Sequence, residues 1–272
     1  MRSVKIKEVI DALERFAPLP LQESYDNAGL QVGLTEAEVS GALLCLDVTE
    51  RVVDEAITKG CNLIVAHHPL IFRKLSQVTD ANYVQRTVIK AIKNDIVIVA
   101  MHTNLDAAFG GVNFKIAEKL GLRGVRFFGR EKVVTNPLTD KKVTGGDGVI
   151  GCFDTPLAAD DLILLLKKEF DVECVQANEL LRREIRTVAL CGGSGSFLLQ
   201  DAINAGADAF ITGEMGYHEF FGHEQEIQLC VIGHYQSEQY TTEVLRDVIE
   251  RDCPGVKCCI SEINTNPIVY FS

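Results

Sequence analysis

The sequence predicts an α/β protein built from two related domains, with sheets layered between helices. Apolar runs of strand length alternate with amphipathic helical stretches along most of the 272 residues, a pattern typical of α/β proteins. Several of the runs are apolar at nearly every position, as expected for strands covered on both faces. One segment of the first half also recurs in the second half. The length allows one large domain or two ordinary ones.

Six apolar runs are the strand candidates, and each leads into polar or turn-forming residues. They are residues 42–48, 61–67, 96–102, 187–192, 209–213 and 227–234. Helical patterns lie between them, for example at 50–60, and the first eighteen residues form another amphipathic pattern. In the stretch 237–252, four apolar side chains fall on one helical face, namely Val244, Leu245, Val248 and Ile249.

The repeated segment is seen when residues 42–68 are placed over residues 188–214 without gaps, at a constant offset of 146. Leu44, Cys45, Ala56, Ile57 and Gly60 then meet Leu190, Cys191, Ala202, Ile203 and Gly206. Each copy runs strand, helix, glycine, strand and polar loop, although any two strand–helix–strand units share part of this likeness. We expect two related halves with functional loops beyond the carboxyl ends of their strands. The polar, turn-rich stretch 128–148 is the predicted junction.

Composition and charge exclude several classes of function. The formal net charge is −11 and basic residues do not cluster, which argues against nucleic acid as the main partner. No apolar run approaches the ~20 residues of a membrane span, and the opening residues lack the pattern of a signal peptide. The nine cysteines form no CxxC pair and lie mostly in apolar runs. Buried, reduced thiols in a cytoplasmic protein are therefore expected, with a redox or metal role for Cys253, Cys258 and Cys259 as the alternative.

The six histidines all end or follow apolar runs, and His67 and His68 do so as a pair. Consecutive residues of a regular strand point to opposite faces, so both imidazoles can serve one site only where the strand breaks. Pro69 favours such a break. Two adjacent imidazoles suit two metal ions about 3.5–4 Å apart, with one ligand for each. A purely structural role for the pair is the alternative.

Two further strand ends carry carboxylates. Asp106 follows the run that ends at His102, and it either bridges cations or caps the next helix. Glu238 lies four residues after His234, so both share a face if a helix begins there; otherwise the histidine lies in the core and the glutamate faces solvent. Parallel strands bring such ends to one edge, where three histidines and two carboxylates suffice for two borderline metal ions.

Five motifs carry a resemblance to a known family. In order they are SYDNAGLQVG, LIVAHHPLIF, HTNLDAAFGGVN, ADAFITGEMGYHEF and GHYQSE, and they resemble the GTP cyclohydrolase 1 type 2 homologues, a Nif-three-like family with a dinuclear metal centre. The likeness covers essentially the whole chain. It implies metal ligands at the positions matching His67, His68, Asp106, His234 and Glu238. His102 and the segment from Glu214 to His218 match positions near the family's pocket.

The resemblance also implies the domain arrangement and the assembly. We expect a Nif-three-like fold in which residues 1–127 plus 235–272 form a first domain with most of the metal ligands, and residues 128–234 form the second. Some members of the family insert a large domain between the halves, where this chain has only the short junction. A ring-shaped homohexamer is implied as well.

The expected activity is hydrolysis with two divalent metal ions, which could be zinc, manganese, iron, cobalt or nickel. The family name indicates GTP as the small-molecule substrate, with water attacking C8 of guanine. His102, Glu214 and His218 are the candidate proton carriers. No P-loop is present, and residues 192–196 either hold a phosphate on backbone N–H groups or form a tight turn. The alternatives are a phosphoesterase or other small-molecule hydrolase, and a non-enzymatic hexameric metal-binding scaffold or regulator.

Overall fold

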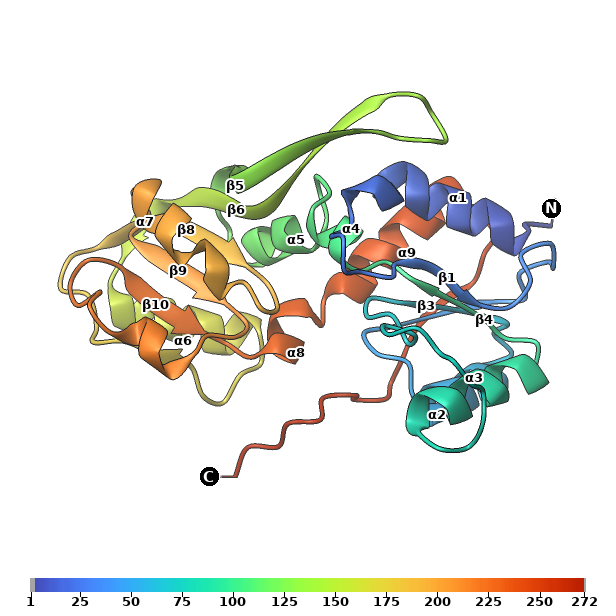
Figure 1. The fold of residues 1–272 in the computed structure, drawn as a ribbon. Helices are drawn as coiled ribbons and strands as arrows, with labels where there is room; N and C mark the ends of the chain where they lie inside the picture. The colour runs from blue at the N-terminus through green and yellow to red at the C-terminus, as the bar shows by residue number, and fades with distance from the viewer. Residues whose placement is uncertain (1–2, 272) are drawn as a thin grey trace. The chain divides into compact units, whose positions relative to one another are not determined.

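The computed structural model describes residues 3–271 and contains two α/β units, which confirms the predicted fold class (Figure 1). Unit 1 takes the described residues up to Leu105, then Thr135–Lys142, and those from Thr241 onwards. Unit 2 takes Asp106–Val134 and Val143–Tyr240. These boundaries differ from the expected ones at residues 127 and 234. Helix α5 (Val112–Lys119) packs against strand β8 (Ile185–Cys191) and against helix α8 (His234–Glu238), so both helices belong to unit 2.

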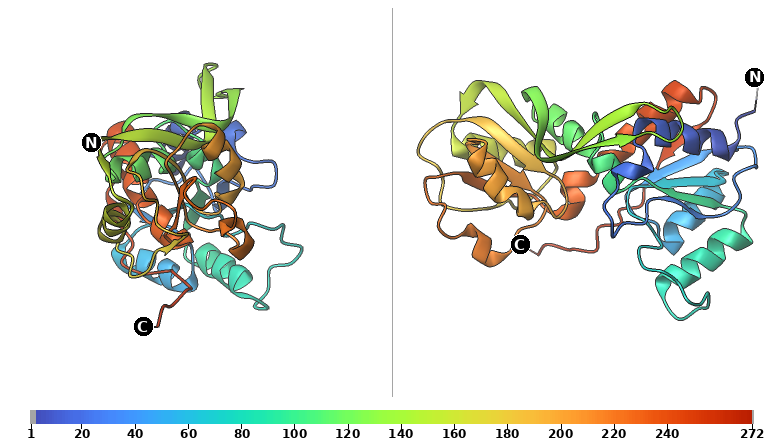
Figure 2. Two further views of the ribbon diagram at one scale, coloured as in Figure 1. Left: turned by 90° about the vertical axis from the view of Figure 1, so that its left-hand side faces the viewer. Right: turned by 45° about the horizontal axis from the view of Figure 1, so that its top comes forward.

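Unit 1 is a five-stranded sheet between two layers of helices. The strand order is β1 (Gly29–Val32), β4 (Val97–Ala100), β3 (Leu63–Ala66), β2 (Ala42–Cys45) and β11 (Cys258–Ile260). Only the β1–β4 pair within this sheet is antiparallel. Figures 1 and 2 show α1 (Ile6–Phe16) and α9 (Thr241–Asp252) over one face, and α2 (Glu50–Lys59) and α3 (Tyr83–Lys93) over the other. The three-layer arrangement agrees with the prediction.

The core of unit 1 explains why its strand ends are well placed. Strands β2, β3 and β4 are buried at every position, as predicted for strands covered on both faces. One face of the sheet packs Leu43, Ile64 and Ile98 against residues of α2 and α3 such as Val52 and Val88. Side chains that follow these strands therefore start from fixed backbone.

Unit 2 has a six-stranded sheet. Its order is β5 (Arg123–Thr135), β6 (Lys142–Leu157), β8, β9 (Ala209–Thr212), β10 (Gln228–Val231) and β7 (Gln176–Ala177). Helix α7 (Leu199–Asn204) packs its Ala202 against Ala189 and Phe210 of the sheet. Helix α6 (Ala159–Glu169) lies on the far side of this sheet in Figure 1.

The stretch 128–148, predicted as a turn-rich junction, consists mainly of strand. Strands β5 and β6 are neighbours in the sheet and leave only residues 136–141 as a connecting turn. Most of β5 is exposed or half-buried, so its composition resembles that of a loop although its Val and Thr residues favour strand. The strand and helix expected after this stretch are present as β6 and α6.

The repeat found in the sequence is exact in the pairing of its strands. Ala42 pairs with Leu63, and Val188 pairs with Ala209, and adding 146 to 42 and 63 gives 188 and 209. The helix ends agree as well, because Gly60 and Gly206 have φ values of 69° and 71°. The two copies share both the register of their strands and the conformation at the end of their helices. This agreement supports an internal duplication over a chance likeness of two strand–helix–strand units.

The cysteines lie mostly at buried positions. The nine cysteines are free thiols, and Cys45, Cys61, Cys191, Cys230 and Cys253 are buried. Cys258 and Cys259 belong to β11, where they pair with β2. Among residues 3–271, no helix is long and apolar enough to cross a membrane.

Candidate metal centre

The paired imidazoles lie where β3 ends. The N–H groups of His67 and His68 donate to the carbonyl oxygens of Cys45 and Leu46 at 3.1 and 2.9 Å. A regular parallel ladder uses every second residue for such bonds to one neighbour, so the regular alternation stops here. The two ring centroids are 4.8 Å apart. The expected break of the strand is therefore present, and it brings both rings together.

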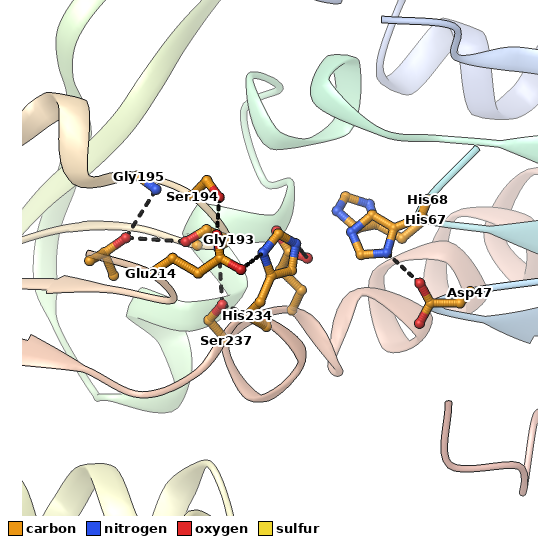
Figure 3. A network of polar contacts seen from close by, with 12 residues as sticks. Asp47, His67, His68, Gly193, Ser194, Gly195, Glu214, His234 and Ser237 are labelled. Atoms are coloured by element: carbon orange, nitrogen blue, oxygen red, sulfur yellow. Dashed lines mark hydrogen bonds and ion pairs between the residues drawn. The ribbon is translucent and has the colours of Figure 1, made fainter. Parts of the chain in front are cut away.

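Each ring of the pair is held through Nδ1. His67 Nδ1 lies 2.8 Å from the carbonyl oxygen of Met101, and His68 Nδ1 lies 2.8 Å from Oδ1 of Asp47 (Figure 3). A carbonyl or a carboxylate only accepts, so Nδ1 carries the proton in both rings. In the neutral imidazole, the lone pair that can bind a metal is then on Nε2.

His102 joins this pair within unit 1. Its ring centroid is 5.4 Å from that of His67 and 5.4 Å from that of His68. The three imidazoles offer nitrogens that lie within 4.8 Å of one another, so this group could hold a metal ion.

Two carboxylates that the sequence reasoning missed orient these rings. His102 Nδ1 contacts Oδ1 of Asp26 at 2.7 Å. Burial alone would raise the pKa of Asp26, but hydrogen bonds from His102 and Thr103 lower that pKa to about 2. Burial likewise opposes ionisation of Asp47, while His68 and Thr265 lower its pKa below the usual value. An acidic residue at the end of the apolar run 42–48 was the available signal for Asp47.

Unit 2 presents a second imidazole–carboxylate set on the short helix α8 (His234–Glu238). His234 Nε2 lies 3.1 Å from Oε2 of Glu238, as the spacing of four residues predicts. Glu238 is buried, with 4% of its surface exposed, whereas 32% of the His234 side chain is exposed. The alternative of a core histidine with a solvent-facing glutamate is thus wrong.

Glu214, expected as a proton carrier, holds His234. One carboxylate oxygen of Glu214 is 3.0 Å from His234 Nδ1, and the other accepts a hydrogen bond from the Ser194 hydroxyl (Figure 3). Nδ1 of His234 is therefore engaged by a carboxylate, in the same way as Nδ1 of His68 and His102.

The glycine-rich loop 192–196 is a tight turn whose donors are used within the protein. The N–H groups of Gly192, Gly193 and Gly195 donate to side-chain oxygens of Asn113, Ser237 and Thr212 at 2.9, 3.0 and 3.1 Å. These bonds favour the turn over the phosphate cradle that was its alternative.

Gly193 has a specific reason to be glycine. Its φ is +59°, and a Cβ atom there would lie 2.3 Å from Oε1 of Glu238. The absence of a side chain therefore lets the buried carboxylate approach the turn.

Asp106 is the last residue of helix α4 (Thr103–Asp106). The N-cap of the following helix α5 is Gly111, so Asp106 is not its cap. Burial raises the pKa of the Cys191 thiol well above its usual range, and the nearby carboxylates of Asp106 and Glu238 raise it further. Both carboxylates of unit 2 thus lie close to the same buried thiol.

The third candidate proton carrier, His218, lies in an exposed turn (Tyr217–Phe220). Its ring centroid is 5.2 Å from that of Tyr217 and 6.2 Å from that of Phe221. His218 is therefore part of an aromatic surface group of unit 2.

Comparison with known proteins gives consistent matches along the whole chain. Residues 4–267 match the family described as Duf34/NIF3 (NGG1p interacting factor 3). A Clostridium perfringens protein named GTP cyclohydrolase 1 type 2 homolog is 34% identical over 271 residues, which cover 98% of this chain and 100% of that protein.

Solved structures are similar too. A Staphylococcus aureus hypothetical protein matches with a TM-score of 0.88 and 28% identity, covering 99% of this chain and 100% of that one. A Bacillus cereus protein related to NIF3 matches with a TM-score of 0.86 and 25% identity over 100% of both chains.

Proposed function

The chain belongs to the Duf34/NIF3 family, and from that premise we propose that it is a metal-dependent hydrolase of the GTP cyclohydrolase type. Two divalent ions would be held by His67, His68, Asp106, His234 and Glu238. These donors suit zinc, manganese, iron, cobalt or nickel and leave positions for water.

One observation carries the proposal: each of four imidazoles is held through Nδ1. Met101 holds His67, and carboxylates hold His68, His102 and His234. Metal-binding histidines almost always donate their second ring N–H to a carboxylate or a carbonyl, which fixes the ring and raises its basicity. His223 makes the same kind of contact with Glu226 at the surface, so the contact alone does not identify a ligand. Ligation through Nε2 is supported because His67, His68 and His102, held in this way, also offer nitrogens within 4.8 Å of one another.

In this proposal, a bound pair of divalent ions supplies Lewis acidity and a nucleophile from water at neutral pH. Asp47 and Glu214 keep His68 and His234 in the orientation that ligation requires. Asp26, whose pKa of about 2 keeps it ionised at neutral pH, holds Nδ1 of His102 at 2.7 Å and so orients this ring to exchange protons with the substrate. Addition of water at C8 of guanine would open the imidazole ring, and a second water would release C8 as formate.

The test compares the wild type with a His68→Ala variant and a matched control. His223 is the control because its Nδ1 also contacts a carboxylate, that of Glu226 at 2.9 Å, in an exposed turn. We expect two metal ions per chain and formate release from GTP in the wild type and in His223→Ala. The His68→Ala variant should lose metal binding and should no longer release formate from GTP. Elemental analysis and a formate assay measure these quantities.

The outcomes separate the competing functions. Equal metal content in wild type and His68→Ala would overturn the metal centre. Metal without formate release would remove the cyclohydrolase activity, and a screen of phosphoesters and other small amides or esters would then test the broader hydrolase. Metal with no turnover in that screen would favour the scaffold or regulator.

We also propose that the protein is a cytoplasmic homohexamer that acts on a small molecule, possible substrates being nucleotides. Family resemblance supports the assembly, and the nine free thiols fit a reducing compartment. Native mass spectrometry should give six copies per particle, and a monomer would contradict the proposal.

A further inference from the structure

We propose that the C-terminal segment 261–266 is a strap that positions His68 through a hydrogen bond from Thr265 to Asp47. This inference rests on the proposed metal centre and deepens it. Thr265 would be a positioning residue, acting on the candidate ligand through Asp47.

Each oxygen of the Asp47 carboxylate accepts one hydrogen bond. Oδ1 faces His68 Nδ1 at 2.8 Å, and Oδ2 accepts the Thr265 hydroxyl at 2.7 Å. With both oxygens engaged, the carboxylate plane is fixed, and so is the ring that it holds. Loss of the Thr265 hydroxyl would let the carboxylate rotate, because only one of its oxygens would keep its donor.

The same arrangement of one imidazole and one hydroxyl on a carboxylate occurs three times among residues 3–271. Asp26 takes His102 Nδ1 on one oxygen and the Thr103 hydroxyl on the other. Glu214 takes His234 Nδ1 on one oxygen and the Ser194 hydroxyl on the other. Asp47 repeats this arrangement with Thr265.

The repetition indicates a requirement of imidazole placement rather than a chance contact. The hydroxyl of Thr265 stands out because it comes from 218 residues beyond its carboxylate.

The strap is anchored to unit 1 by residues 261–263, just before Thr265. Ser261 N–H donates to the carbonyl of Leu44 at 2.8 Å, in continuation of β11. Glu55 accepts from the Ser261 hydroxyl at 2.5 Å and from the Glu262 N–H at 2.8 Å. Ile263 packs on the apolar cluster beneath. The strap therefore delivers Thr265 to Asp47 from a fixed position.

The experiment uses the full chain and Co²⁺ as the probe. Thr265→Val removes the hydroxyl at nearly constant volume, and Thr265→Ser retains it. Thr58→Val is the matched control, because its hydroxyl bonds only within α2, to the carbonyl of Asp54 at 2.8 Å. Substitution of a residue that directly holds a metal-binding histidine typically weakens metal affinity about 10–100-fold. One step further out, we expect ~3–10-fold weaker Co²⁺ binding for Thr265→Val, with wild-type affinity for the other two variants.

A second readout does not depend on metal. Side-chain ¹⁵N spectra of the metal-free protein report the Nδ1–H of His68, and we expect this signal to broaden or shift in Thr265→Val alone. An unchanged signal together with wild-type Co²⁺ affinity would overturn the strap. If the wild type binds no Co²⁺, the metal centre fails, yet the ¹⁵N spectra still decide the strap. If Thr265→Val does not fold, Thr265→Ala answers the same question.

Discussion

The two copies of the duplicated unit, β2–α2–β3 and β8–α7–β9, share their backbone and differ in the residues that follow each strand. At the offset of 146, Asp47 corresponds to Gly193 and His68 corresponds to Glu214. In unit 1 the first loop supplies a carboxylate and the second supplies imidazoles. In unit 2 the first loop supplies glycine backbone and the Ser194 hydroxyl, and the second supplies a carboxylate. Buried strands and helix ends preserve the fold, whereas the chemistry resides in the residues just after the strands.

The source of the imidazole explains the difference. Unit 2 takes its histidine from α8, and that helix occupies the space beside the two loops. A Cβ atom on Gly213, the counterpart of His67, would lie 2.7 Å from both Ser237 Oγ and the carbonyl oxygen of Gly193. A histidine at this position is therefore excluded once α8 is in place.

Among substitutions that test this difference between the two copies, Gly193→Ala is expected to have the largest effect on stability. The new Cβ would overlap Glu238 Oε1, in addition to the strain of a positive φ, so we expect a loss of about 3 kcal/mol in unfolding free energy. Gly206→Ala is the control, because its φ is +71° with nothing within 4 Å of the new Cβ. It should cost only ~1 kcal/mol. Urea unfolding measures both, and equal losses would show that Glu238 is not the reason for the glycine.

An intermediate effect is expected from the two carboxylates that hold imidazoles. Asp47→Asn and Glu214→Gln each weaken the hold on one Nδ1–H, so each should lower metal affinity about 10–100-fold. Glu226→Gln, at the surface pair with His223, should change nothing. Titration with Zn²⁺ or Co²⁺ gives the affinities. An effect in only one of the two units would show that their carboxylates have different roles.

The smallest effect on stability is expected at two equivalent side chains, Asn62 just before β3 and Asp208 just before β9. Asn62 Oδ1 accepts the N–H of Ser40 at 2.9 Å, and Asp208 Oδ2 accepts the N–H of Arg186 at 3.0 Å. At the offset of 146, Ser40 corresponds to Arg186 and Asn62 corresponds to Asp208. Burial would raise the pKa of Asp208, but the hydrogen bonds from Thr187, Arg186 and Arg183 lower it below its usual value. Only the copy in unit 2 can therefore titrate.

Asp208→Asn should cost about 1 kcal/mol at neutral pH, through the loss of hydrogen bonds to a charged group. Because the folded pKa is depressed, the contribution of Asp208 is complete above the unfolded value of ~3.9 and is lost as pH falls through the folded value. The stability difference between wild type and variant should thus shrink below about pH 4. Unfolding curves from pH 7 downwards check this, and a constant difference would contradict it.

The main strands and helices could be predicted because their signals are local. The fully apolar runs became β2, β3, β4, β8, β9 and β10, and Pro69 marked the break that brings two imidazoles together. Strand β11 was not predicted, since three residues at a sheet edge carry no usable periodicity. Strand β5 and the first residues of β6 were missed because β5 is almost entirely exposed or half-buried and the start of β6 is polar and rich in glycine.

The partners of the candidate ligands were harder to predict than the ligands. Asp47 lay inside a run assigned to a strand, and Asp26 lay in a motif without a recognisable role. Thr265 reaches Asp47 from 218 residues away, a distance over which spacing carries no information. The ligands themselves follow strand ends, which is a local signal, whereas the groups that orient them are brought close only by tertiary structure.

The discontinuity of unit 1 has a consequence for synthesis on the ribosome. All of unit 2 lies before residue 241, whereas β11 and α9 come after it. Until residues 241–260 emerge, the edge of β2 lacks the parallel partner β11, and the face that α9 covers is open. An uncovered strand edge is a template for wrong pairing, and domains generally fold in the order of their synthesis. The nascent protein should therefore complete unit 2 first, while the edge of β2 stays open to wrong pairing until residues 241–260 have emerged.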